Sequence, residues 1–293
     1  MEPTSRTIPG ADGLPIHVLE WSQGGTPLVF LHGFSNEAHI WDAAAPAVAP
    51  YYRTVALDLR GHGDSGRDPE GRYDYDFHVA DLECVLGALG IDRCVLVGHS
   101  LGGRIAMRFA GKHPNRLAGL VIVDSAPELD VRGTVRITLD LQRGGASGGD
   151  GLSFESEAAY ANLLARAYPA VAPAVLARMA HHMLRRRDDG RFEAKLDPNW
   201  FSGRKGADEA EMRAREETLT REMWDALANV PCPTLVVRGA ASDVMSPEVA
   251  DKMAEDVLQR GQLAVVAKAG HSVMVDNPEG FAKALTGFVL GEE

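Results

Sequence analysis

Residues 93–103 read RCVLVGHSLGG, and this stretch decides the fold. An apolar run typical of a buried strand ends at Gly98, and the residues after Gly103 have helical apolar spacing up to a proline. Ser100 therefore lies on a sharp bend between a strand and a helix. A serine in such a bend takes a positive φ, which is costly for a residue with a Cβ. The stretch predicts a nucleophile elbow with Ser100 as the nucleophile.

Three glycines surround Ser100, and each has a steric role at an elbow. Residues two before and two after the nucleophile nearly touch, so Gly98 and Gly102 leave room for the bend. Gly103 allows the following helix to lie close to the sheet. A second Gly-x-Ser-x-Gly match is centred on Ser147, but no strand precedes it, and we interpret Ser147 as a loop serine.

The composition is that of a globular chain with an acidic balance. The 293 residues are 45% hydrophobic and 24% charged, and the formal net charge is −11. This charge argues against nucleic acid or an anionic membrane as the main partner. No apolar stretch is long enough for a membrane span, and the N-terminus has no signal-peptide pattern. The three cysteines lack zinc or redox spacing, so we expect reduced thiols in a cytoplasmic protein.

Strand-like and helix-like segments alternate through most of the chain. After a hairpin expected in the first twenty residues, the continuous apolar runs are 26–31, 53–58, 93–98, 117–124, 233–239 and 262–267. The helical segments between them include 74–90, 101–114, 246–260 and 277–290. This alternation predicts an α/β fold: a mostly parallel twisted sheet of about eight strands with helices on both faces. Active residues of such sheets lie at the carboxyl ends of the strands.

One long interval has no convincing parallel strand and consists of helices and loops. We therefore divide the chain into a core, residues 1–126 and 231–293, and an inserted helical cap (lid), residues 127–230. The cap is rich in arginine, which fits either solvated helix faces or the attraction of an anionic substrate. His181 and His182 in the cap have no matching ligand set in the sequence, so we expect no metal site.

A serine nucleophile needs a base, and the base needs a third group that orients it. His271 follows the last strand in a short glycine loop and is the candidate base. Two aspartates compete for the role of the acid. Asp243, in the loop after the strand 233–239, is the favoured one, and Asp124, at the end of the strand 117–124, is the alternative. Both lie at strand ends from which they could reach the far nitrogen of the histidine.

Two backbone N–H groups should stabilise the oxyanion that develops during attack. One is that of Leu101, the residue after the nucleophile. The other is that of Phe34, in the loop after the strand 26–31, where His32 and Gly33 shape the turn. Such chemistry requires neither a metal nor an organic cofactor.

Five motifs, in this order and at these strand ends, resemble the α/β-hydrolase superfamily, in its serine-nucleophile esterase and lactonase branch with a helical cap. They are HGF (32–34), DLRGHGDS (58–65), GHSLGG (98–103), SDVMSP (242–247) and GHSVMVDNP (270–278). The order Ser, Asp, His along the chain also fits that family. The resemblance implies that the DLRGHGDS loop, with His62, is mainly structural and lines the floor of the pocket.

The resemblance implies hydrolysis of a carboxylic ester or lactone, a small-molecule substrate, through an acyl-enzyme on Ser100. Epoxide hydrolases and haloalkane dehalogenases use an aspartate nucleophile and are disfavoured. C–C bond hydrolases and cofactor-free perhydrolases or haloperoxidases have the same serine triad and stay open as alternatives. A non-enzymatic small-molecule receptor on the same fold is the second alternative, disfavoured because all three triad residues are present. The sequence does not indicate an oligomeric state.

Overall fold

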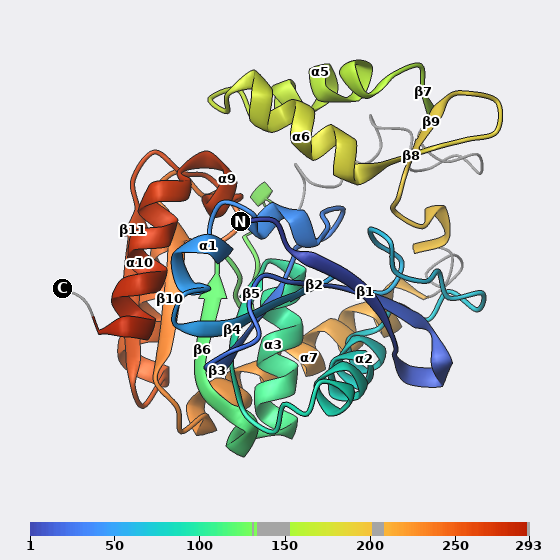
Figure 1. Ribbon diagram of the computed structural model, residues 1–293. Helices are drawn as coiled ribbons and strands as arrows, with labels where there is room; N and C mark the ends of the chain where they lie inside the picture. The colour runs from blue at the N-terminus through green and yellow to red at the C-terminus, as the bar shows by residue number, and fades with distance from the viewer. Residues whose placement is uncertain (131, 134–152, 201–207, 292–293) are drawn as a thin grey trace.

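The computed structural model describes residues 1–130, 132–133, 153–200 and 208–291 (Figure 1). Its centre is an eight-stranded sheet in the order β1-β2-β4-β3-β5-β6-β10-β11. The strands are β1 (Thr4–Pro9), β2 (Pro15–Glu20), β3 (Thr26–Leu31), β4 (Tyr52–Leu57), β5 (Cys94–His99), β6 (Leu117–Val123), β10 (Thr234–Gly239) and β11 (Gly261–Val266). The second Gly-x-Ser-x-Gly match, at Ser147, lies outside the described residues.

The sheet is mixed but mostly parallel. β1 and β2 form an antiparallel hairpin, and β2 pairs antiparallel with β4. All the other pairings, from β4 through β3, β5, β6 and β10 to β11, are parallel. The predicted α/β fold with about eight strands is therefore confirmed, and the carboxyl ends of the parallel strands share one edge of the sheet.

Helices cover both faces of the sheet (Figure 1). One face packs against α2 (Tyr75–Ala88), α3 (Leu101–Lys112), α7 (Glu209–Asn229), α8 (Pro247–Asp251) and the π-helical η5 (Lys252–Val257). The other packs against α1 (Ala45–Val48), α9 (Val273–Asp276) and α10 (Pro278–Leu290). Short 3-10 helices lie between these elements, among them η1 (Ala11–Gly13), η2 (Ala38–Trp41) and η3 (Pro114–Arg116).

The helix predicted over residues 246–260 is shorter and less regular than expected. It begins at Pro247 with Ser246 as its N-cap, changes to π-helical geometry at Lys252 and ends at Val257. The apolar spacing of the sequence could not reveal the change, because Ala250 and Met253 face the core in either geometry.

A second layer, the α5–α6 layer, lies apart from the sheet at the top of Figure 1. It comprises β7 (Ser153–Phe154), α5 (Glu157–Ala167), α6 (Pro173–Met183), β8 (Leu184–Arg186) and β9 (Phe192–Ala194). Its three strands form a small antiparallel sheet in the order β7-β9-β8. The sequence analysis anticipated helices in this interval but not this sheet, because strands of two or three residues leave no periodic pattern.

Helix α7 does not join the α5–α6 layer, although it lies within the predicted cap of residues 127–230. It packs against α3, and Met223 and Leu227 are fully buried in the same cluster as Phe109. By its packing, α7 therefore groups with the helices that cover the sheet and not with the α5–α6 layer. Because α7 has a buried apolar side and a long charged side, its sequence fits a helix on the sheet as well as a helix in a cap.

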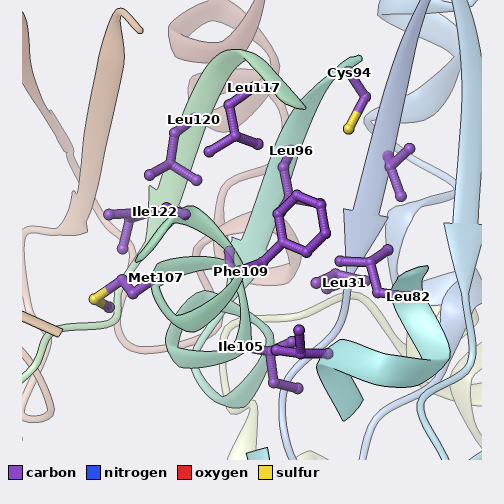
Figure 2. Close-up of a cluster of buried hydrophobic side chains, with 14 of the residues drawn as sticks. Leu31, Leu82, Cys94, Leu96, Ile105, Met107, Phe109, Leu117, Leu120 and Ile122 are labelled. Carbon is purple, nitrogen blue, oxygen red and sulfur yellow. The ribbon is translucent and has the colours of Figure 1, made fainter. Parts of the chain in front are cut away.

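The apolar core beneath the elbow is built around α3. Figure 2 shows Phe109 and Ile105 of α3 against Leu96 of β5 and Leu82 of α2, with Leu120 and Ile122 of β6 beside them. Each of these side chains is at most 1% exposed. This packing fixes the helix that begins at the residue after Ser100.

Within the part of the chain that the structure describes, no helix combines the length and the hydrophobicity needed to cross a membrane.

Phe109→Ala should lower the free energy of unfolding by about 3–5 kcal/mol, because it leaves a cavity in a fully buried cluster. Urea unfolding followed by circular dichroism measures this change. Val265→Ala in β11 is the control: its side chain is 55% exposed, so the change should stay below about 0.5 kcal/mol. Equal effects of the two substitutions would contradict this assignment of the core.

Candidate active site

Ser100 lies between β5 and α3 in a left-handed conformation, with φ 51° and ψ −113°. This is the strained bend that the sequence predicts. Three bonds hold it: the Ser100 N–H donates to the carbonyl of Val123 (3.1 Å), and the carbonyl of Ser100 accepts from Ser125 Oγ (2.7 Å) and from the N–H of Arg104 (3.1 Å). Because these partners come from β6, the loop after it and α3, the bend is fixed from several sides.

The three glycines lie where a side chain would collide with backbone or a neighbouring residue. A Cβ on Gly98 would come within 2.3 Å of the carbonyl oxygen of Gly102, and a Cβ on Gly102 within 2.3 Å of the carbonyl oxygen of Leu31. A Cβ on Gly103 would come within 2.5 Å of Ser125 Cβ. The close approach expected at the elbow is therefore present. Gly103 allows α3 to pack against Ser125, in the loop after β6.

Ser100, His271 and Asp124 form a continuous chain of hydrogen bonds. His271 Nε2 is 3.0 Å from Ser100 Oγ, and His271 Nδ1 is 2.8 Å from Asp124 Oδ2. The side chain of His271 is 15% exposed and that of Asp124 fully buried. This is the arrangement in which a histidine can take a proton from a serine hydroxyl while a carboxylate orients the ring.

The structure differs here from the favoured interpretation of the sequence: the carboxylate that bonds to His271 Nδ1 is that of Asp124, the alternative, and not that of Asp243. Asp124 directly follows β6 and has a positive φ of 45°. Its carboxylate accepts from the N–H of Gly239 (3.1 Å) and from Ser242 Oγ (2.6 Å), in addition to His271. Asp243 is half-buried one residue after Ser242, and its charge contributes to a raised pKa of Arg132, after the larger effect of Asp130.

The sequence could not separate the two aspartates, because β6 and β10 are adjacent parallel strands. Both strands carry an aspartate at or after their carboxyl end, on the same edge of the sheet. What differs is the loop: Ser242 Oγ accepts from the N–H groups of Val244 and Met245 and donates to Asp124. The loop after β10 thus provides Ser242 as a hydrogen-bond donor to Asp124.

The loop after β3 approaches the elbow closely. The carbonyl of His32 accepts from the N–H of Gly102 (3.1 Å), and a Cβ on Gly33 would lie 3.2 Å from Ser100 Cβ. Phe34 follows in the same loop. The N–H of Leu101 opens α3, where the first N–H groups have no carbonyl partner inside the helix. Both predicted oxyanion donors thus belong to segments that adjoin Ser100.

His32 is a fixed neutral element of this loop. Its Nε2 accepts from the N–H of Leu59 (2.9 Å), so Nδ1 carries the proton and donates to the carbonyl of Gly33 (2.7 Å). Complete burial lowers the pKa of His32. His32 therefore joins the loop after β3 to the DLRGHGDS loop after β4.

The DLRGHGDS loop is organised by Asp58. This buried carboxylate accepts from the N–H groups of Ala38 (2.6 Å) and Asp64 (2.8 Å) and lies 2.8 Å from His17 Nδ1. His62 is fully buried as well, and burial lowers its pKa to about 3. In the described hydrogen bonds, neither Asp58 nor His62 contacts Ser100, His271 or Asp124. These contacts are those of a loop with a structural role.

His99, directly before Ser100, contacts the loop of the candidate base. Its Nε2–H donates to the carbonyl of His271 (2.9 Å), so it holds the backbone of the residue whose ring faces Ser100. Burial lowers the pKa of His99 well below its usual range, and the ring is neutral. The bonds of Ser125 to Ser100 and of Ser242 to Asp124 were not predicted, although Ser242 begins the SDVMSP motif, because a loop serine has no pattern that reveals its partner.

Two groups of side chains among the described residues have the types and spacing of metal ligands. They are His39, Asp42 and His182, and His17, Asp58 and Asp64. Neither group includes Ser100, His271 or Asp124.

Comparison with known proteins agrees with the fold. The sequence profile of the family described as alpha/beta hydrolase fold matches residues 26–278. The chain is 29% identical to a 2-(acetamidomethylene)succinate hydrolase of Mesorhizobium japonicum, over 91% of this chain and 89% of the relative. It is 28% identical to the esterase Rv0045c of Mycobacterium tuberculosis, over 93% of this chain and 85% of the relative.

A solved structure is similar over the whole chain. It is the crystal structure of an alpha/beta hydrolase from Novosphingobium aromaticivorans, with a TM-score of 0.79 and 28% sequence identity. The superposition covers 100% of this chain and 99% of that protein.

Gly98→Ala should distort the elbow, because the new Cβ meets backbone that has no room to move. We expect a lower melting temperature and slower labelling of Ser100 by a fluorophosphonate probe. Gly87→Ala is the matched control: Gly87 is exposed in α2 with no atom near its Cβ position, and the change should stabilise by about 0.5–1 kcal/mol. Normal labelling of the Gly98 variant would contradict the packing described above.

Asp124→Asn should slow fluorophosphonate labelling of Ser100 by roughly 10⁴-fold, because the amide holds the wrong tautomer of His271. Asp243→Asn is the control and should leave labelling within a few fold of the wild type. A large loss in the Asp243 variant beside normal labelling of the Asp124 variant would reverse the assignment of the acid.

Proposed function

The chain belongs to the alpha/beta hydrolase fold family, and we propose that it hydrolyses a carboxylic ester or lactone through an acyl-enzyme on Ser100. The observation that carries the proposal is the unbroken chain from Ser100 Oγ through His271 to Asp124, at 3.0 and 2.8 Å. A fold alone permits many functions, whereas this geometry suits acyl transfer.

In the first half of the reaction, Ser100 Oγ attacks the carbonyl carbon of the substrate while His271 Nε2 accepts the hydroxyl proton. The carboxylate of Asp124 stabilises the imidazolium that forms. The N–H groups of Phe34 and Leu101 donate to the developing oxyanion at the N-terminus of α3. His271 then gives the proton to the leaving oxygen, and the acyl group stays on Ser100.

In the second half, water replaces the alcohol. His271 takes a proton from the water, the resulting hydroxide attacks the acyl carbon, and the bond to Ser100 Oγ breaks. The proton returns from His271 to Ser100, and the carboxylic acid leaves. The chemistry proposed uses only groups of this chain and water.

We also propose that the α5–α6 layer is the cap that shapes the substrate pocket. One contact of the layer supports this role: Ser272 Oγ is 3.3 Å from the hydroxyl of Tyr168, directly after α5. Beyond β9, the ring of Trp200 lies 5.3 Å from that of Phe34, in a tilted arrangement. Residues from the interval between β6 and β10 therefore adjoin both the base loop and the oxyanion loop.

The arginines of this layer favour solvated helix faces over an anionic-substrate site. The described partners are carboxylates for Arg178, Arg185 and Arg187, and Ser153 for Arg191. Since the charges of Arg178, Arg185 and Arg187 are paired with carboxylates, we propose a neutral ester or lactone as the substrate class.

Ser100→Ala should reduce the hydrolysis of p-nitrophenyl esters by roughly 10⁶-fold in kcat, because it removes the hydroxyl that lies 3.0 Å from His271 Nε2. The esters are offered with graded acyl lengths, so the same assay measures the size of the acyl pocket. The Asp243→Asn protein, folded and with an intact triad, serves as the active control.

The outcomes separate the candidate functions. Turnover that survives in the Ser100 variant would overturn the acyl-enzyme. A wild type that reacts with a fluorophosphonate but cleaves no ester would favour a C–C bond hydrolase or a cofactor-free perhydrolase, which require the same triad. No turnover and no labelling would favour a small-molecule receptor.

A further inference from the structure

Helix α6 meets η2 through two histidines. The rings of His182 in α6 and His39 in η2 stack with centroids 3.6 Å apart and planes 17° from parallel. Asp42 follows η2 directly, and its carboxylate lies 3.1 Å from His39 Nδ1. These residues come from the α5–α6 layer and from the core, about 140 positions apart in the sequence.

The three side chains offer a ligand set for a transition-metal ion. One nitrogen from each histidine and a carboxylate oxygen lie within 4.8 Å of one another. Two imidazoles and one carboxylate suit Zn²⁺, Co²⁺, Ni²⁺ or Cu²⁺, whereas Mg²⁺ and Ca²⁺ prefer an all-oxygen set. Three protein ligands leave a coordination position for water.

The ligand atoms are accessible and largely uncommitted. The side chains of His39 and Asp42 are 21% and 12% exposed, so an ion can enter from solvent. In the part of the chain that the structure describes, no side chain hydrogen-bonds to a ring nitrogen of His182. Asp42 Oδ1 has a bond only to His39, at 3.2 Å, among the described contacts.

The other candidate group, His17, Asp58 and Asp64, differs in this respect. Asp58 already accepts from two backbone N–H groups and from His17. Asp64 pairs with Lys195 at 2.7 Å. The carboxylate oxygens of Asp58 and Asp64 therefore already have protein partners. An ion would have to displace bonds that hold a buried loop.

The guanidinium of Arg178 already contacts the group of His39, Asp42 and His182. Arg178 Nη1 is 2.6 Å from Asp42 Oδ2, and the arginine side chain is 44% exposed. The carboxylate at this contact is thus neutralised from the α6 side. A divalent ion would compete with the guanidinium, which can move into solvent at little cost because it is half exposed.

We propose that His39, Asp42 and His182 bind one Zn²⁺-type ion that links α6 to η2. Ligand atoms about 2 Å from a tetrahedral ion lie roughly 3.3 Å apart, so the group must contract. One of the two stacked rings must also turn, because an ion cannot lie in both planes at once. Since η2 follows the loop of Phe34, the ion would fasten the α5–α6 layer beside the candidate oxyanion site.

The test is a calorimetric titration of the full-length protein with Zn²⁺ at neutral pH. The wild type should bind one ion per chain, and His182→Gln and His39→Gln should each weaken binding by more than about tenfold. His181→Gln is the matched control: His181 is the neighbouring residue of α6, pairs with Glu157 at 3.1 Å and should leave the affinity unchanged.

Arg178→Gln should increase the affinity for Zn²⁺, whereas the two histidine substitutions should decrease it. Removing the competing cation should tighten Zn²⁺ binding by roughly tenfold, the effect of about one charge interaction near a protein surface. Zn²⁺ should also raise the melting temperature of the wild type more than that of His182→Gln, since an ion that binds the folded state stabilises it.

Three results would overturn the proposal: no Zn²⁺ binding by the wild type, the same affinity in wild type and His182→Gln, or weaker binding in Arg178→Gln. The second result would assign the ion to another histidine, such as His271. Because none of these measurements uses turnover, failure of the metal site and failure of the proposed hydrolysis are distinguishable.

Discussion

The left-handed bend at Ser100 depends on three parallel strands at once. A serine with φ 51° stores of order 1–3 kcal/mol of strain, and the surrounding structure must compensate for it. β5 carries the serine, β6 accepts the Ser100 N–H through Val123, and the residue after β3 accepts the Gly102 N–H. The bend therefore exists only when these strands are in register, and that register also brings their loops together.

Asp124 and the loop after β10 stabilise each other. Asp124 receives hydrogen bonds from Gly239 and Ser242 at the end of β10, as well as from His271. Ser242 in turn caps two N–H groups of its own loop. A fully buried carboxylate needs several donors to stay ionised. The same bonds that orient His271 thus satisfy the charge of Asp124 and fix the β10 loop beneath it.

The interval between β6 and β10 serves two parts of the molecule. α7 buries Met223 and Leu227 against α3 and belongs with the helices that cover the sheet. The α5–α6 layer meets the core at η2, through stacked histidines and the ion pair of Arg178 with Asp42. Apolar packing adds to these polar contacts, since buried side chains of the layer such as Leu176 and Met179 belong to the same hydrophobic cluster as Trp41 of η2.

The sequence by itself determined the sheet, the helices on its faces, the elbow and the residues that follow each strand. These features depend on local periodicity and on glycines that only a tight bend requires, as at Gly98 and Gly102. Only the tertiary structure showed that His271 bonds to Asp124 and not to Asp243. It also showed that α7 packs against α3 and that His182 stacks on His39. Those outcomes depend on the paths of loops and on contacts between distant segments, which leave no periodic trace in the chain. The physical reason is that strand order puts several candidate side chains at one edge, and loop hydrogen bonds such as those of Ser242 then select among them.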